Sequence, residues 1–276
     1  MTDGPDYHDR QSKGRRGKTT TAVNLASCLA AAKRRTLLVD LDPQGNATSG
    51  LGVDKNAVEN TVYSLINDET LNPEAALVQA HFQDLSLLPS NIQLIGAEVE
   101  LLSDGGREGR LARVLDKLRD SFEFILIDAP PSLGLLTINA LAASDHVLVP
   151  VQSEYYALEG LAQLMDTIRR VQSSFNRNLD ILGLLLTMHD ARTNLSRQVE
   201  EELRAHFGEK VFDTVISRSI RLGEAPSYGK PIILYDFRSH GAAQYMSLCE
   251  EVVKRLVRTG AIAQKRAQAA ERPAKR

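Results

Sequence analysis

The stretch 13–21, KGRRGKTTT, constrains the fold more than any other part of this sequence. Gly17 lets the backbone approach an anion closely, and Lys18 beside it supplies a positive charge. Thr19 adds a hydroxyl of the kind that binds Mg²⁺. The apolar spacing that follows predicts a helix over 19–32, whose unpaired N–H groups and positive dipole end would face the same anion. The stretch therefore predicts a glycine-bearing turn that enters a helix near Lys18 and cradles the phosphates of a nucleotide.

The residues ahead of this turn do not resemble what normally precedes it. A buried parallel strand, seen as a short run of Val, Ile or Leu, usually leads into a phosphate-binding turn. Residues 1–12 read MTDGPDYHDRQS and contain no such run, and Asp, Gly and Pro are poor strand formers. Either the chain lacks the first strand, or it builds the strand from these residues, or its natural form begins elsewhere. We treat 1–12 as an atypical N-terminal segment.

Two apolar runs end on aspartates and predict neighbouring strands of an α/β domain. Residues 36–40, TLLVD, are followed closely by Asp42, and residues 122–128 end on Asp128. Ligands of open α/β sheets bind at the carboxyl ends of the strands, where such carboxylates can hold magnesium and orient a water. Other segments fit the same pattern: strands over 146–151, 181–187 and 211–216, and helices over 157–172, 195–207 (capped by Asn194) and 241–257.

Three segments together resemble the ParA/MinD family of ATPases, the class with a deviant Walker A motif. The turn is similar to K-G-G-x-G-K-[ST]-T, although Arg15 stands where the family has its second glycine. The other two segments are VDLDPQGNATSGLG at 39–52 and DAPPSLG at 128–134. The loop 217–231 is similar to that of the ParA/Soj-type chromosome-partitioning ATPases. The resemblance covers 13–258 and implies a P-loop ATPase domain with a doubly wound, mostly parallel sheet flanked by helices.

The resemblance also implies roles for single residues. Lys13 would reach across a dimer to the partner's ATP, and Asp42 would position the attacking water, so these two form the catalytic set. The nucleotide-binding set comprises Gly14, Arg15, Arg16, Gly17, Lys18, Thr19 and Thr20 from the turn and helix, with Ser217 and Arg218 from a loop that borders the adenine. The metal set is Thr19, Asp40 and Asp128, and the DNA-binding set is Arg192, Arg221 and Lys230.

The function implied by the resemblance is an ATP-dependent DNA-partitioning switch with ATP and Mg²⁺ as cofactors. Two copies would close into an ATP-sandwich homodimer that binds double-stranded DNA nonspecifically, and hydrolysis would release the DNA. A ParB-like centromere-binding protein is the implied partner. A second hypothesis is a hydrolysis-impaired nucleotide- and DNA-binding dimerisation module, because Arg15 replaces a glycine whose backbone approaches phosphate.

Composition restricts the partners and the cellular compartment that we expect for this protein. The formal net charge of the 276 residues is −2, so any contact with DNA must come from a local basic patch. Only two cysteines occur, which suits a reducing compartment, and no apolar run is long enough to span a membrane. The tail 259–276 is basic and lacks bulky apolar anchors apart from Ile262, so we expect it to be flexible and not to bind a membrane. We expect a cytoplasmic, nucleoid-associated protein.

Overall fold

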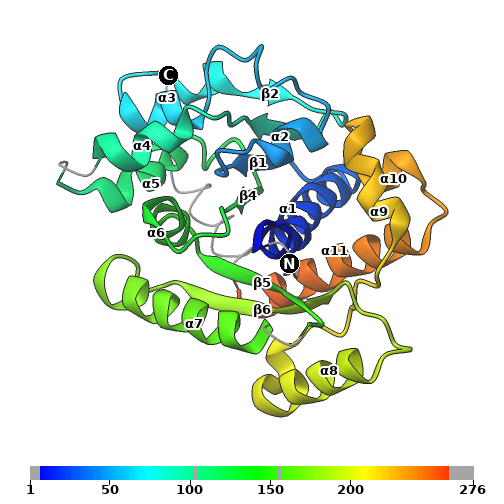
Figure 1. The fold of residues 1–276 in the computed structure, drawn as a ribbon. Helices are drawn as coiled ribbons and strands as arrows, with labels where there is room; N and C mark the ends of the chain where they lie inside the picture. The colour runs from blue at the N-terminus through cyan, green and yellow to red at the C-terminus, as the bar shows by residue number, and fades with distance from the viewer. Residues whose placement is uncertain (1–6, 102–104, 155–156, 261–276) are drawn as a thin grey trace, which may run out of the picture.

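The computed structural model describes residues 7–101, 105–154 and 157–260. Figure 1 shows helices packed around a central region of strands. The strands are β1 (Thr36–Asp40), β2 (Val78–Gln79), β3 (Leu85–Leu88), β4 (Phe124–Asp128), β5 (His146–Gln152) and β6 (Asp180–Thr187). The larger helices are α1 (Tyr7–Ala31), α5 (Arg110–Asp116), α6 (Leu135–Ala142), α7 (Ala157–Ser174), α8 (Asn194–Phe207) and α11 (His240–Arg258), and the short ones are α2 (Asn46–Gly50), α3 (Val62–Asn67), α4 (Leu94–Glu100), α9 (Ile220–Glu224) and α10 (Ile232–Tyr235).

The prediction of a mostly parallel sheet flanked by helices is confirmed. One sheet has the order β2-β3-β1-β4, in which only the short β2 runs antiparallel. A second, parallel sheet consists of β5 and β6. All residues of β1 are buried, as expected for a strand covered on both faces. The two largest apolar clusters of the core lie under α3 to α6 and between α1, β6 and α11.

The strands form two sheets because β4 and β5 are not paired with each other in the described part of the chain. The helix α1 contacts strands of both sheets, and Figure 1 shows it running alongside them. α1 begins at Tyr7, the first residue that the structure describes, so residues 7–12 of the polar sequence ahead of the glycine-bearing stretch are helical. The missing pairing between β4 and β5 is therefore consistent with the polar sequence ahead of the glycine-bearing stretch.

The predicted turn at the glycine-bearing stretch is wrong in this structure. The helix begins at Tyr7 rather than near Lys18, so the backbone of residues 13–17 is helical. A strand ahead of the stretch would fix its direction and force a turn. Residues 7–12 are helical and form no such strand. Arg, Lys and Gln are good helix formers, and each residue added to an existing helix gains a hydrogen bond.

Two further local predictions are also wrong. Residues 211–216 form no strand, and only single bridges join Val211 to Leu184 and Ser217 to His189. The cap of α8 is Thr193 rather than Asn194, because the extended Thr193 places its hydroxyl where it accepts a hydrogen bond from the backbone N–H of Ser196 at 3.3 Å. No helix within the described ranges is both long and apolar enough to cross a membrane.

Candidate functional site

Three carboxylates meet at the carboxyl ends of β1 and β4. The two strands are parallel neighbours, and their register places Asp40 opposite Asp128. Asp42 follows two residues after the end of β1, and all three aspartates are buried. Burial of three acidic groups at one sheet edge is unfavourable unless a cation or hydrogen-bond donors accompany them. This edge is therefore the best-defined candidate site in the described residues.

Asp40 organises the loop that carries Asp42. Its Oδ1 accepts a hydrogen bond from the backbone N–H of Asp42 at 3.2 Å, and its Oδ2 accepts from the N–H and hydroxyl of Thr48 at 2.8 and 2.7 Å. Burial raises the pKa of Asp40 to about 6, although the bonds from Thr48 and Asp42 oppose that rise. Because both oxygens already accept hydrogen bonds, Asp40 suits a position behind a metal ion better than direct ligation. Sequence reasoning did not identify Thr48, whose role depends on the tertiary contact.

Asp128 provides the group that most directly fits a metal ion. The Thr19 hydroxyl donates a hydrogen bond to its carboxylate, while its Oδ2 is buried without a hydrogen-bond partner. Burial, and then the charge of Asp40, raise the pKa of Asp128 well above its usual range, and Lys18 acts in the opposite direction. A buried carboxylate oxygen without a partner, beside a threonine hydroxyl, matches the oxygen ligands of Mg²⁺.

No three His, Cys, Asp or Glu side chains in the described ranges are placed to hold a metal ion by themselves. This does not conflict with the fit at Asp128. Magnesium usually takes one or two protein carboxylates and completes its octahedron with water and substrate phosphates. Thr19 and Asp128 would thus supply the protein's share of the ligands, with Asp40 in support.

The part of α1 around Lys18 brings a positive charge to this acidic edge. Burial lowers the pKa of Lys18, and the charges of Asp128 and Asp42 oppose this effect. Gly17 packs closely against the ends of β5 and β6, because an added Cβ would lie 3.2 Å from Nε2 of Gln152. The predicted residues Gly17, Lys18 and Thr19 are thus brought to the strand ends.

The helix is fastened behind this turn by two polar side chains that sequence reasoning did not single out. The Thr21 hydroxyl donates to the Gly17 carbonyl at 2.7 Å and lies 3.3 Å from the hydroxyl of Tyr245 on α11. Asn24 donates to the carbonyl of Thr20 at 2.8 Å and accepts from the backbone N–H of Ile232 at 2.7 Å. Both residues read as ordinary helix positions in the sequence, and only the packing reveals their partners.

The remaining residues of the predicted phosphate cradle are placed only by their backbone. Lys13, Gly14, Arg15 and Arg16 lie in the N-terminal part of α1, and their side chains are outside the described parts of the structure. The catalytic role of Lys13 and the phosphate contacts of the other three therefore stay predictions. Their helical backbone does not form the curved cradle that a phosphate requires.

The loop predicted to border the adenine is attached to α11. The backbone N–H of Ser217 donates to Oε1 of Gln244 at 3.0 Å, and Nε2 of Gln244 donates to the Ser217 hydroxyl at 2.9 Å. The N–H of Arg218 donates to the carbonyl of His189, just beyond β6, at 3.0 Å. These bonds fix the loop beside the carboxyl end of β6 and leave its nucleotide contact a prediction.

Two of the three residues predicted to contact DNA already have carboxylate partners. Arg192 forms a two-pronged ion pair with Asp190 at 2.8 and 2.7 Å, which holds the pKa of Asp190 below its usual range. Arg221 lies 3.3 Å from Glu224 and 3.6 Å from an oxygen of Asp236. Lys230 is exposed. Exposed ion pairs of this kind are weak, so DNA phosphates can compete for both arginines.

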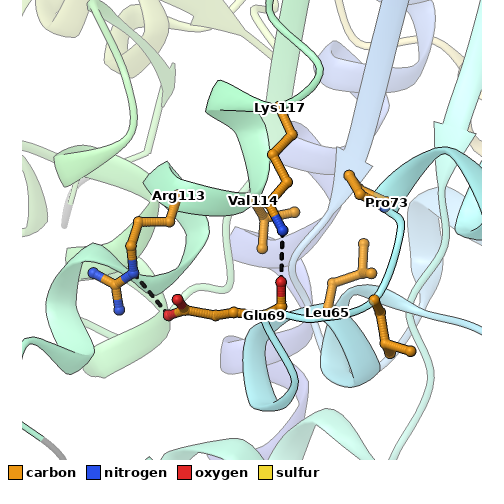
Figure 2. Close-up of a pocket in the computed structure, with 7 residues that line it drawn as sticks. Leu65, Glu69, Pro73, Arg113, Val114 and Lys117 are labelled. Atoms are coloured by element: carbon orange, nitrogen blue, oxygen red, sulfur yellow. Dashed lines mark hydrogen bonds and ion pairs between the residues drawn. The ribbon is translucent and has the colours of Figure 1, made fainter.

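A hollow elsewhere on the surface has no comparable chemistry. Figure 2 shows Glu69 between Arg113 and Lys117, with Leu65 and Pro73 beside it. The cavity measures about 20 Å³, which is room for roughly one water. Arg113 donates to Oε1 of Glu69 at 2.7 Å and Lys117 to its carbonyl oxygen at 2.6 Å, so the charged groups there satisfy one another. The hollow stabilises the surface and offers no ligand site.

Comparison with known proteins identifies the family of this chain. A family model described as "AAA domain" matches residues 10–181. The sporulation initiation inhibitor protein Soj of Bacillus subtilis is 56% identical over 240 residues, covering 87% of this chain and 94% of Soj. The chromosome partitioning protein ParA of Myxococcus xanthus is 51% identical, covering 88% of this chain and 86% of ParA.

A solved structure gives the same fold. Cobyrinic acid a,c-diamide synthase from Mycobacterium smegmatis, with bound ATP analogue and magnesium, has a TM-score of 0.77 and 37% sequence identity, covering 89% of this chain and 92% of that one. The cofactors predicted from the sequence, ATP and Mg²⁺, match the ligand type and the metal of that structure. Together with the curated relatives, it shows that the chain belongs to the ParA/MinD family of P-loop ATPases and, within it, to the Soj/ParA chromosome-partitioning ATPases.

Proposed function

We propose that this chain binds Mg·ATP at the edge formed by β1, β4 and α1, and hydrolyses it. The observation that carries the proposal is a convergence: Lys18 and Thr19 from α1 lie at the edge where Asp128 ends β4 and Asp42 follows β1. A lysine, a hydroxyl and carboxylates in one buried edge are the parts that phosphoryl transfer to water requires.

Each residue has a separate task in this reaction. Lys18 binds the β- and γ-phosphates, and Thr19 and Asp128 hold the metal ion, which would neutralise charge on the phosphates when bound. Asp42 orients the attacking water, and its Oδ1 is fixed by a hydrogen bond from the backbone N–H of Gln44 at 2.9 Å. Asp40 holds the loop that carries Asp42 in place. Lys13 of a second copy adds positive charge where negative charge develops, so that turnover depends on dimerisation.

The proposal extends to DNA. Two copies close around ATP, and the homodimer presents Arg192, Arg221 and Lys230 of both copies to duplex DNA. Contacts of this kind go to phosphates, so they are salt-dependent and independent of base sequence. Hydrolysis opens the dimer and releases the DNA. A ParB-like centromere-binding protein stimulates that step, and the chain works in the cytoplasm on the nucleoid.

The test compares the full chain with Mg·ATP, with Mg·ADP and without nucleotide. Sedimentation measures the oligomeric state, and fluorescence anisotropy measures binding to two duplexes of unrelated sequence. We expect a dimer, and DNA binding that is tighter by at least about tenfold, with ATP only. Arg192→Ala should weaken binding to both duplexes equally and reduce the salt slope by about two, because each dimer loses two arginines. A chain that stays monomeric with ATP and binds DNA equally in all three states contradicts the proposal.

One observation favours the hydrolysis-impaired alternative. The backbone of residues 13–17 is helical, whereas phosphate binding requires it to curve around the anion. A chain that has to unwind this part of α1 before it binds ATP would bind the nucleotide more weakly. In that case ATP binding and dimerisation remain, while turnover with DNA present is low. Measured turnover per bound ATP distinguishes the competent ATPase from the hydrolysis-impaired form.

A further inference from the structure

Asn24 connects the nucleotide helix to the segment that carries Lys230. It lies on α1, about one and a half turns after Lys18 and Thr19, and only 4% of it is exposed. Its Nδ2 donates to the carbonyl of Thr20 at 2.8 Å. Its Oδ1 accepts at 2.7 Å from the backbone N–H of Ile232, which lies 208 residues further along the chain. Asn24 thus joins α1, which carries part of the proposed ATP site, to the segment of Lys230, which is proposed to contact DNA.

The bond to Ile232 satisfies a group that has no other acceptor among the hydrogen bonds of the described residues. Ile232 is the first residue of α10, it is fully buried, and the preceding Pro231 supplies no side-chain cap. A buried N–H at a helix start must find a partner, and leaving it unpaired costs free energy. Asn24 therefore acts as the cap of α10 from a distant part of the chain. The position of α10 then follows that of α1.

The Lys230 loop, residues 229–231, also contacts the segment that follows the loop of Asp42. Gly229 has a positive φ of 61° and touches Gly52 so closely that an added Cβ would lie 2.6 Å from the Gly52 Cα. The carbonyl of Gly229 is hydrogen-bonded to Nε2 of His81 at 2.7 Å. Gly52 directly follows α2, which comes after the loop of Asp42. The Lys230 loop is therefore held at Gly229 by the segment that follows Asp42, and it continues into Ile232, which is bonded to α1.

We propose that Asn24 is a positioning residue that fixes the Lys230 loop to the nucleotide helix, so that DNA contact by Lys230 depends on the state of the nucleotide site. The inference deepens the proposed function and rests on it for its second half. Displacement of α1 on nucleotide binding is transmitted to Ile232 through a short, buried hydrogen bond. Exposed side chains near Lys230 have no comparable link to α1 in the described residues.

The chain offers a closely matched control in Asn139. It is also buried on a helix, donates to the carbonyl four residues earlier (Leu135, 3.1 Å), and accepts from a distant backbone N–H (Leu111, 3.1 Å). It differs in place, because it joins α6 to α5 and touches neither the nucleotide edge nor the Lys230 loop. Asn139 also donates to the carbonyl of Arg107 at 3.0 Å, so Asn139→Leu removes the same two kinds of hydrogen bond as Asn24→Leu, together with one more, from a different region.

The first measurement is amide hydrogen exchange of the full chain without nucleotide. We expect Asn24→Leu to speed the exchange of the Ile232 amide by at least about tenfold, because its acceptor is lost, while Asn139→Leu leaves it unchanged. Asn24→Asp keeps an oxygen for that N–H and should retain most of the protection. Unchanged exchange in Asn24→Leu overturns the positioning role, as does equal loss in the Leu and Asp variants.

The second measurement is the ratio of duplex-DNA affinity with Mg·ATP to that with Mg·ADP, together with ATP affinity. We expect Asn24→Leu to lower this ratio by about fivefold or more while ATP affinity changes little. Asn139→Leu should keep the ratio of the parent. If Asn24→Leu keeps the parent's ratio of DNA affinities with Mg·ATP and Mg·ADP, the coupling is overturned. A parent protein without any ATP-dependent gain contradicts the proposed function instead, and the exchange measurement still decides the role of Asn24.

Discussion

The two halves of the candidate site differ in what determines their shape. The acidic half, Asp40 and Asp128, stands on paired parallel strands whose register places the two carboxylates side by side. The basic half, residues 13–18, stands on a helix that begins at Tyr7 and has no strand ahead of it in the described residues. The comparison teaches that a catalytic motif acquires its geometry from the element that precedes it, because the sheet, rather than the motif, sets the direction of the chain.

The largest expected effect tests whether the basic half belongs to the site at all. Lys18→Ala should reduce ATP affinity on the order of 100-fold, since a charge-assisted contact to phosphate contributes about 3 kcal/mol. Alanine is a good helix former, so α1 should persist and circular dichroism should be unchanged. Isothermal titration with a nonhydrolysable ATP analogue measures the loss, with Lys254→Ala on α11 as control. Equal ATP affinities in the two variants would show that Lys18 of α1 takes no part in the ATP site at the acidic edge.

The next effect concerns the acidic half alone. The pKa of Asp40 is raised to about 6 by burial, so its contribution to stability is complete below its unfolded-state pKa and is lost as pH rises through about 6. Asn at this position cannot ionise. Between about pH 4 and pH 7, without metal or nucleotide, the stability of Asp40→Asn relative to the parent should therefore rise by on the order of 2–3 kcal/mol. Urea unfolding at several pH values measures this difference, and a constant difference contradicts the burial of a charged group.

The smallest effect sharpens the comparison between helix and turn. Arg15→Gly should weaken the N-terminal part of α1 by about 1 kcal/mol relative to Arg15→Ala, because glycine is a poor helix former. If the helix competes with the form that binds phosphate, the glycine variant should bind ATP about fivefold more tightly than the alanine variant. Titration measures both affinities. Equal binding would remove the basis for the hydrolysis-impaired hypothesis.

Parts of the fold were predictable because they depend on local patterns. Residues 36–40, TLLVD, contain three consecutive apolar residues before an aspartate, and they form β1 with those bounds. The helix over 241–257 is found as α11 with one residue more at each end. Residues 211–216, VFDTVI, are also mainly apolar, yet no strand forms there and only isolated bridges occur, because strand formation depends on a partner as well as on composition.

Residue types and their spacing along the chain were enough to predict the family and the α/β class, which are confirmed, and to name candidate site residues, whose roles stay predictions. Tertiary structure decided which side chains support them: Thr48 behind Asp40, and Asn24 beneath Ile232. It also decided that residues 13–17 are helical. The physical reason is the same in each case. A hydrogen bond between distant segments, or the absence of a neighbouring strand, leaves no periodic trace in the sequence, because it depends on where the chain returns in space.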